Sequence, residues 1–234
     1  MNRLQKLPFS LSLAALLTSV TAVPAAAQAD PDIASAQGSD PMPAGWQVRL
    51  DRSGASRAAL RFVSMDEGMH VSSGPAAIYW HPGNLASGPF AVEATFTQTK
   101  APMHAEAFGL FWAGKDLAAD NQSYMYFIVR GDGKYMVKHR AGAETHEVVP
   151  WTEHAGVSKQ DESGAAKTTL RVEVTDASTR LFANGQLLRE LPKSGVTAQG
   201  DGIVGLRVNH NLDVHVTALV VDKWLDARPG PASP

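Results

Sequence analysis

Alternation of apolar and polar residues is the feature that most constrains the fold of this 234-residue chain. Residues 90–97 read Phe-Ala-Val-Glu-Ala-Thr-Phe-Thr, with an apolar residue at every second position, and the pattern recurs at residues 170–174, 204–208 and 214–220. A period of two places successive side chains on opposite faces of a strand. Each of these segments is therefore predicted to be a half-buried antiparallel strand.

Further short runs of β-branched and aromatic residues, bounded by turn residues, predict more strands. They cover residues 46–50, 60–63, 69–72, 76–80, 107–113, 124–130, 134–140 and 144–149. No segment has the 3.6-residue apolar period of an amphipathic helix. Many short strands with turn signals at near-regular spacing predict an all-β fold, either a sandwich or a barrel.

Two hairpins can be predicted from their turn residues. Asn184-Gly185 separates residues 180–183 from residues 186–189, and an Asn-Gly pair favours a type I′ turn because both central residues need a positive φ. The second hairpin turns at Gly131-Asp132-Gly133.

The length of this second loop decides which side chains share a face. A two-residue loop would pair Phe127 with Lys138 and mix apolar and charged side chains. A three-residue loop sets Phe127 opposite Val137. The other face then carries Tyr124, Tyr126, Lys138 and Arg140, together with Ile128 and Met136. Because a slip of one residue exchanges the two faces, the clean separation favours the three-residue loop.

The N-terminal residues 1–29 have the layout of a secretory signal peptide. Arg3 and Lys6 precede an apolar stretch that is too short and too rich in Ser and Thr for a membrane span, and Ala27-Gln28-Ala29 matches a cleavage site. The protein is therefore predicted to be exported and soluble, in the periplasm or the medium. With no cysteine in the chain, a lipid-anchored N-terminus, disulfides and thiolate chemistry are all excluded.

The rest of the chain is predicted to form one domain. Residues 30–45 are rich in Ala, Asp, Ser and Pro and are expected to be a disordered leader, and the proline-rich residues 226–234 a flexible tail. Residues 46–225 form the domain. The formal net charge is −2 and no run of Lys or Arg stands out, so nucleic acids and anionic membrane surfaces are not expected as partners.

Two stretches of the domain resemble a known superfamily. The first stretch lies within residues 108–134 and reads Phe-Gly-Leu-Phe-Trp-Ala-Gly-Lys-Asp-Leu, followed by Ser-Tyr-Met-Tyr-Phe-Ile-Val-Arg-Gly-Asp-Gly-Lys. The second stretch consists of residues 169–174, the Asn-Gly hairpin, and Gly-Ile-Val-Gly-Leu-Arg-Val at residues 202–208. Residues 46–222 resemble the concanavalin A-like lectin/glucanase superfamily, and most closely its laminin-G-like and 3-keto-disaccharide hydrolase-like branch. The resemblance implies a jelly roll of two curved antiparallel sheets, with a carbohydrate as the expected partner on the concave face or its rim loops.

The polar face of the second hairpin has the chemistry of a sugar-binding site. Aromatic rings pack against the C–H faces of sugars, and cationic and amide groups donate to hydroxyl groups. We expect the ligand-binding residues to be Tyr124, Tyr126, Lys138, Arg140, Arg207 and Trp112. Tyr124 and Tyr126 could instead cap a sheet edge or pack under a loop. Trp112 could be buried, because it lies on the same face of its strand as Phe108 and Leu110.

Catalytic residues are not identified. The E-x-D-x-E strand pattern of retaining glucanases is absent, and a glycosidase needs two carboxylates on either side of the scissile bond. If the protein is an enzyme, Glu93, Glu173 and His81 are the candidates for acid or base.

The sequence does not predict that the protein needs a bound metal ion. Asp116, Asp120 and Asn121 offer oxygen ligands that suit Ca²⁺, but Asp and Asn are also common in loops because they satisfy turn backbones. Calcium is therefore left as one possible cofactor.

Three functions remain open: a carbohydrate-binding domain with little or no catalysis, a glycoside or 3-keto-glycoside hydrolase, and a structural or protein-interaction module without a sugar ligand. A shallow aromatic cleft would favour the first, an acid pair in the groove the second, and a groove filled by the protein's own side chains the third.

Overall fold

The computed structural model describes residues 41–52 and 54–223 of the chain. The predicted signal peptide, the tail at 226–234 and all but the last five residues of the predicted leader lie outside this part. Residues 41–45 form a turn in which the Trp46 N–H donates to the Pro43 carbonyl at 3.2 Å. No helix in the part of the chain that the structure describes has the length and apolar character needed to cross a membrane.

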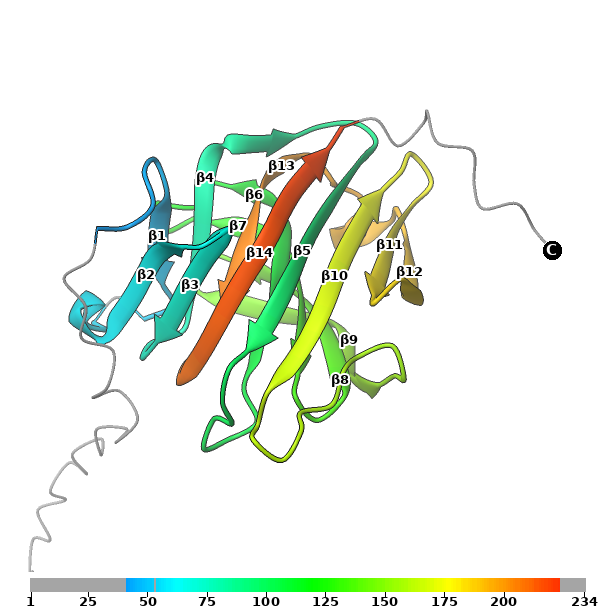
Figure 1. Ribbon diagram of the computed structural model, residues 1–234. Helices are drawn as coiled ribbons and strands as arrows, with labels where there is room; N and C mark the ends of the chain where they lie inside the picture. Colours follow the sequence, from blue (N-terminus) through cyan, green and yellow to red (C-terminus); the bar gives the residue numbers. More distant parts are fainter. Residues whose placement is uncertain (1–40, 53, 224–234) are drawn as a thin grey trace, which may run out of the picture.

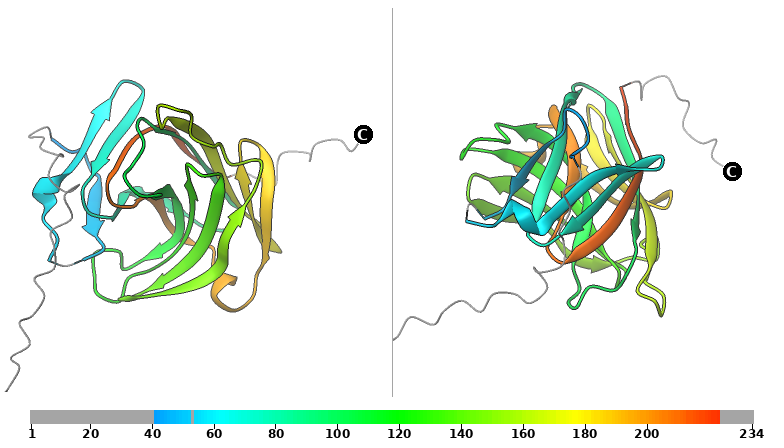
Figure 2. Two further views of the ribbon diagram at one scale, coloured as in Figure 1. Left: turned by 90° about the horizontal axis from the view of Figure 1, so that it is seen from below. Right: turned by 60° about the vertical axis from the view of Figure 1, so that its left-hand side comes forward.

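In the described residues, fourteen strands form two antiparallel layers, seen from the front in Figure 1 and from two further sides in Figure 2. The first layer, sheet A, has the strand order β1-β4-β13-β6-β7-β8-β9. Its strands, given in sequence order, are β1 (Gln47–Leu50), β4 (Ala77–Ala86), β6 (Ala107–Lys115), β7 (Ser123–Arg130), β8 (Lys134–Ala141), β9 (Glu144–Glu153) and β13 (Gly202–Val208).

The second layer, sheet B, has the order β12-β11-β10-β5-β14-β3-β2. Its strands are β2 (Leu60–Met65), β3 (Gly68–Ser73), β5 (Phe90–Gln98), β10 (Ala166–Val174), β11 (Ser178–Ala183), β12 (Gln186–Pro192) and β14 (Leu212–Asp222). Two short 3₁₀ turns, η2 (Arg57–Ala59) and η3 (Gly195–Thr197), complete the regular structure of the described residues. The predicted all-β jelly-roll sandwich of two curved antiparallel sheets is confirmed.

Both predicted hairpins are present. Asn184 and Gly185 have φ of 49° and 78°, as a turn with two positive φ values requires, and they connect β11 to β12. In the β7–β8 hairpin, Phe127 faces Val137 and Tyr126 faces Lys138, which is the register of the three-residue loop. Tyr124, Tyr126, Lys138 and Arg140 therefore share the face of sheet A that points away from sheet B.

The main core lies between the two sheets. It is built from the alternating apolar positions of both layers, for example Phe96 of β5 and Phe108 of β6, whose rings stack with centroids 5.4 Å apart. Trp112 belongs to this core and is buried. Its strand β6 is buried on both faces along nearly all of its length.

A second apolar cluster covers the outer face of sheet A. Its members are aromatic and aliphatic side chains from β4, β6, β7 and β8 together with Leu117 of the β6–β7 loop: Ile78, Trp80, Ala107, Phe111, Leu117, Tyr124, Tyr126, Ile128 and Met136. These residues are buried although they point away from sheet B, because the face curves inward and the loop folds over it. Gly205 of β13 allows this packing, since a Cβ there would lie 2.6 Å from Cε1 of Phe111.

Candidate functional site

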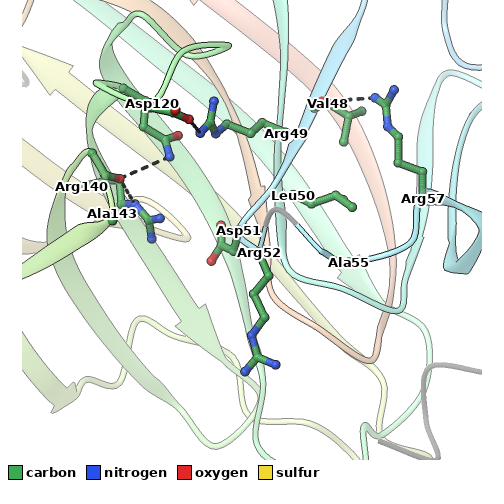
Figure 3. A pocket seen from close by; sticks show the side chains of 12 residues that line it. Val48, Arg49, Leu50, Asp51, Arg52, Ala55, Arg57, Asp120, Arg140 and Ala143 are labelled. Atoms are coloured by element: carbon green, nitrogen blue, oxygen red, sulfur yellow. Dashed lines mark hydrogen bonds and ion pairs between the residues drawn. The ribbon is translucent and has the colours of Figure 1, made fainter. Parts of the chain in front are cut away.

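A pocket of about 590 Å³ opens at one end of this outer face. Strand β1 and the segment that follows it form one wall, and the β6–β7 loop and the β8–β9 turn form the other (Figure 3). Its polar lining is dominated by charged and amide side chains: Arg49, Asp51, Arg52, Asp120, Gln122 and Arg140. The pocket is therefore polar on its walls, next to an aromatic face.

A β-bulge positions the β6–β7 loop. The register between β6 and β7 shifts between Trp112 and Lys115, and Ala113 has a φ of 55° there. A bulge bends its strand and redirects the chain that follows. Within the loop the Asp116 carboxylate accepts a hydrogen bond from the Asn121 amide at 3.0 Å, and the Asp116 carbonyl accepts from the Ala119 N–H at 2.8 Å. This closed loop brings Leu117 onto the aromatic face and Asp120 to the rim of the pocket.

The β8–β9 turn is tied to the same loop. Gly142 has a φ of 57°, a conformation that favours glycine, and its N–H donates to the Gln122 carbonyl at 2.7 Å. Its own carbonyl accepts from Nε of Arg140 at 2.7 Å and from Nε2 of Gln122 at 3.4 Å. These bonds fix Arg140 and Gln122 relative to each other at the pocket wall.

Arg207 of β13 organises the floor. Its guanidinium donates to both carboxylate oxygens of Asp51, at 2.5 and 2.6 Å, and to the Tyr124 hydroxyl at 3.4 Å. It also lies over the Tyr126 ring, 5.3 Å from the centroid, and Nε donates to Asn209 at 3.2 Å. Arg207 is buried, so this set of contacts satisfies a charge that would otherwise be costly.

The charges around Asp51 keep it ionised. Burial alone would raise the pKa of its carboxyl, but the charge and hydrogen bonds of Arg207, with the nearby charges of Arg140 and Arg49, bring that pKa below its ordinary value. Burial raises the pKa of Tyr126 to about 12 and also raises that of Tyr124. At neutral pH the pocket thus offers the acceptor carboxylate of Asp51, and the buried phenol groups behind it are neutral.

The rim carries an exposed ion pair. A guanidinium nitrogen of Arg49 lies 3.3 Å from a carboxylate oxygen of Asp120, whose side chain is fully exposed. Figure 3 shows this pair joining β1 to the β6–β7 loop above the pocket. Exposed pairs of this kind contribute little to stability, so the contact can open for a ligand.

The structure brings together four of the residues predicted from the sequence: Tyr124, Tyr126, Arg140 and Arg207. Tyr124 and Arg207 are in contact, and Arg140 lies close enough to lower the pKa of Asp51. Tyr126 lies beneath Arg207, and Lys138 is its partly buried partner on β8. Both tyrosines are buried, with Tyr124 1% and Tyr126 5% exposed, so the alternative that they pack under a loop describes them better than an open ring face for a sugar.

Other candidates lie away from the pocket. Trp112 points between the sheets, on the same face of β6 as Phe108, which is the buried alternative considered from the sequence. His81 of β4 is near Trp46, with ring centroids 6.4 Å apart, and its Nδ1 accepts the Gly83 N–H. Its side chain lines a different pocket of about 550 Å³.

The two acidic candidates lie on sheet B. Glu93 of β5 and Glu173 of β10 both form ion pairs with Arg171, at 3.5 and 2.8 Å. Glu93 and Glu173 therefore lie in the other layer from the hairpin residues of sheet A. Alternation along a strand predicts which face a side chain is on, but not the sheet to which its strand belongs.

The calcium candidates have separate partners. Asp116 accepts from Asn121, whereas Asp120 is directed to Arg49. Within residues 41–52 and 54–223, no group of three or more His, Asp or Glu side chains is arranged to hold a metal ion.

Five polar residues of the pocket were missed by sequence reasoning: Arg49, Asp51, Arg52, Arg57 and Gln122. A signal for the first two was available, because Arg49 and Asp51 alternate with Val48 and Leu50 in the first predicted strand. The sequence does not show that this edge strand lies across the curved face from the β6–β7 loop.

Comparisons with solved structures place the fold. The chain is similar to the carbohydrate-binding module CBM66 from Bacillus subtilis, at 13% identity and a TM-score of 0.56, over 76% of this chain and 95% of that one. It is also similar to a Bacillus subtilis protein of unknown function with a galectin-like fold, at 12% identity and a TM-score of 0.54, over 76% of this chain and 89% of that one.

A third similar structure is the exoplasmic/lumenal domain of VIP36 in its Ca²⁺/Man3GlcNAc-bound form. The identity is 7% and the TM-score 0.54, over 80% of this chain and 86% of that one. No protein-family model and no curated protein matches the chain by sequence. The shared property is the galectin-like and concanavalin A-like lectin β-sandwich fold.

Proposed function

We propose that this protein binds a saccharide in the pocket between β1, the β6–β7 loop and the β8–β9 turn. One observation carries the proposal: on the hollowed outer face of a lectin-type sandwich, hydrogen-bonding groups converge on a single pocket beside an aromatic floor. Ligand sites commonly combine a shaped cavity with a few fixed polar groups. Two of the similar structures are, by their own descriptions, a carbohydrate-binding module and a domain bound to Man3GlcNAc.

The chemistry of the pocket suits sugar hydroxyl groups. Asp51 is ionised and accepts hydrogen bonds only, Arg140 donates them, and the Gln122 amide does both. The binding set proposed from the sequence is kept in modified form. Arg140 acts at the pocket wall, the buried Tyr124, Tyr126 and Arg207 support the pocket from behind Asp51, and the partly exposed Lys138 extends the surface beside it. The tyrosine rings support the floor, because their burial leaves little ring face for stacking.

We favour binding over hydrolysis. A 3-keto-glycoside or glycoside hydrolase, the activity that goes with the laminin-G-like branch, would need a carboxyl group protonated at neutral pH as the general acid. Asp51 has the opposite shift, and Asp120 is exposed and paired with Arg49. A purely structural role is less favoured, because the aromatic face is filled by the protein's own side chains but the pocket beside it is open.

Export fits this function. The layout of residues 1–29 is that of a cleaved signal peptide, and a secreted or periplasmic binding domain would meet glycans outside the cytoplasm.

The test is a glycan array probed with the purified protein, followed by titration of each hit. Arg140→Ala should lose most of the binding with little change in melting temperature, because its side chain is partly exposed. Arg189→Ala is the matched control, since Arg189 is exposed on β12 in the other sheet. An array without any hit, or equal loss in both variants, would contradict the proposal.

A further inference from the structure

The pocket contains more positive than negative side chains. Four arginines line it, Arg49, Arg52, Arg57 and Arg140, against two aspartates, Asp51 and Asp120. This excess is local, because the whole chain has a formal net charge of −2. Composition therefore does not account for it.

Both aspartates already have partners. Asp51 is held by Arg207 from the floor, and Asp120 lies 3.3 Å from Arg49. Neither carboxylate therefore forms an ion pair with Arg52, Arg57 or Arg140, although Arg140 is near enough to lower the pKa of Asp51. The positive charge in the pocket is greater than a simple count of its lining residues indicates.

Three arginines remain without a carboxylate partner among the described residues: Arg52, Arg57 and Arg140. Arg57 donates to the Val48 carbonyl at 3.2 Å, and Arg140 donates through Nε to the Gly142 carbonyl at 2.7 Å. A carbonyl satisfies a donor without neutralising the charge. Arg52 is exposed on the segment after β1, and Figure 3 shows it extending from the same wall as Asp51.

Arginines elsewhere in the described residues are mostly paired. Arg130 contacts Asp132 at 2.6 Å, Arg171 bridges Glu93 and Glu173, and Arg180 contacts Glu173 at 2.6 Å. The pocket thus departs from the usual pattern of this protein. Arginine offers a planar fork of donors that fits a carboxylate or sulfate group in a bidentate manner.

We infer that the saccharide bound in this pocket carries an oxyanion, a uronate carboxylate or a sulfate ester, held between Arg140 and Arg52. The inference rests on the proposed saccharide-binding function.

The experiment compares ligands that differ only in charge. Isothermal titration calorimetry would measure the affinity of an oligogalacturonate and of its fully methyl-esterified form, and of a dextran sulfate oligomer and the matching dextran. The charged member of at least one pair should bind about tenfold more tightly than its neutral partner. The preference should shrink when NaCl is raised to about 0.5 M, because salt screens exposed charges. If the preference appears in the oligogalacturonate pair, the oxyanion is a carboxylate; if it appears in the dextran pair, the oxyanion is a sulfate.

Two variants locate the effect. Arg52→Gln and Arg140→Gln should each weaken the charged ligand more than its neutral partner, and Arg140→Lys should restore part of the preference because it keeps the charge. Arg189→Gln on β12 is the matched control and should leave the preference intact. Equal binding of charged and neutral partners, or a preference unaffected by Arg52→Gln and Arg140→Gln, would overturn the inference and leave the proposed saccharide binding standing. A glycan array without any hit would overturn the proposed function itself.

Discussion

Arg207 and Asp51 form a two-pronged ion pair, with nitrogen–oxygen distances of 2.5 and 2.6 Å, although they are 156 positions apart in the chain. The pair joins the centre of sheet A to the end of its edge strand β1. It also sets the electrostatics of the pocket, because it keeps Asp51 ionised and holds Arg207 over the Tyr126 ring.

Loss of Asp51 should destabilise the fold. Asp51→Ala leaves the buried Arg207 without its counter-charge, and removing one partner of a buried pair typically costs about 3–5 kcal/mol. Because Asp51 is partly exposed, we expect the lower end, about 3 kcal/mol, in urea unfolding. Asp120→Ala removes a fully exposed carboxylate; it is the control and should unfold like the parent protein. Equal stability of Asp51→Ala and the parent would contradict this account of the floor.

The same pair predicts a pH dependence. The pKa of Asp51 is lowered by folding, so its stabilising contribution is complete above its unfolded pKa of about 3.9 and is lost as the pH falls through the folded value. The stability difference between the parent and Asp51→Asn should therefore be constant from about pH 7 to pH 5 and shrink at lower pH. Urea unfolding across this range measures it. A difference that grows toward acid would show that the ionised carboxylate is not the stabilising form.

Tyr126 should matter for stability as well as for the pocket. Its ring is buried between Tyr124 and Arg207, so Tyr126→Ala should cost about 3 kcal/mol, as for other large-to-small core changes. Tyr126→Phe keeps the ring and should cost less than about 1 kcal/mol. Chemical unfolding of both variants checks this. A stable Tyr126→Ala variant would mean that the ring does not support the floor.

Removing the carboxylate of Asp120 should strengthen binding of a charged saccharide. Asp120→Asn frees Arg49 and removes a negative charge from the rim, so affinity for an oligogalacturonate should rise severalfold while the melting temperature is unchanged. Asp176→Asn, an exposed change in the β10–β11 turn of the other sheet, controls for net charge. An increase of the same size in both variants would assign the effect to the overall charge of the protein.

Calcium removal should have no effect on stability. Asp116 is occupied by Asn121 and Asp120 by Arg49, so these carboxylates do not share a ligand. The melting temperature in EDTA and in excess Ca²⁺ should agree. A rise in melting temperature with Ca²⁺ that Asp116→Asn abolishes would restore the loop as a metal site.

The strands could be predicted from the sequence because both of their signals are local. Alternation marks a half-buried strand, and Asn184-Gly185 marks a turn whatever the rest of the chain does. The register of the β7–β8 hairpin was predictable for a related reason, since only the three-residue loop sets Phe127 opposite Val137 and Tyr126 opposite Lys138.

The pocket could not be predicted because it depends on relationships between distant strands. Arg49 and Arg140 come from opposite sides of sheet A and meet the same cavity only because the sheet curves and the bulge at Ala113 redirects the loop. The burial of the Tyr124 side chain could not be predicted for the same reason. Alternation along β7 places Tyr124 on the outer face, but it does not reveal that Leu117 packs over that face.

The central claim is tested most directly by mapping a saccharide onto the protein with backbone amide chemical shifts. A glycan-array hit would be titrated into ¹⁵N-labelled protein. The account predicts that the amides of Gln122, Gly142 and Ala143 shift most, with Asp51 and Arg52 on the facing wall. Shifts confined to the outer face of sheet B, or centred on Trp46 and His81, would contradict it.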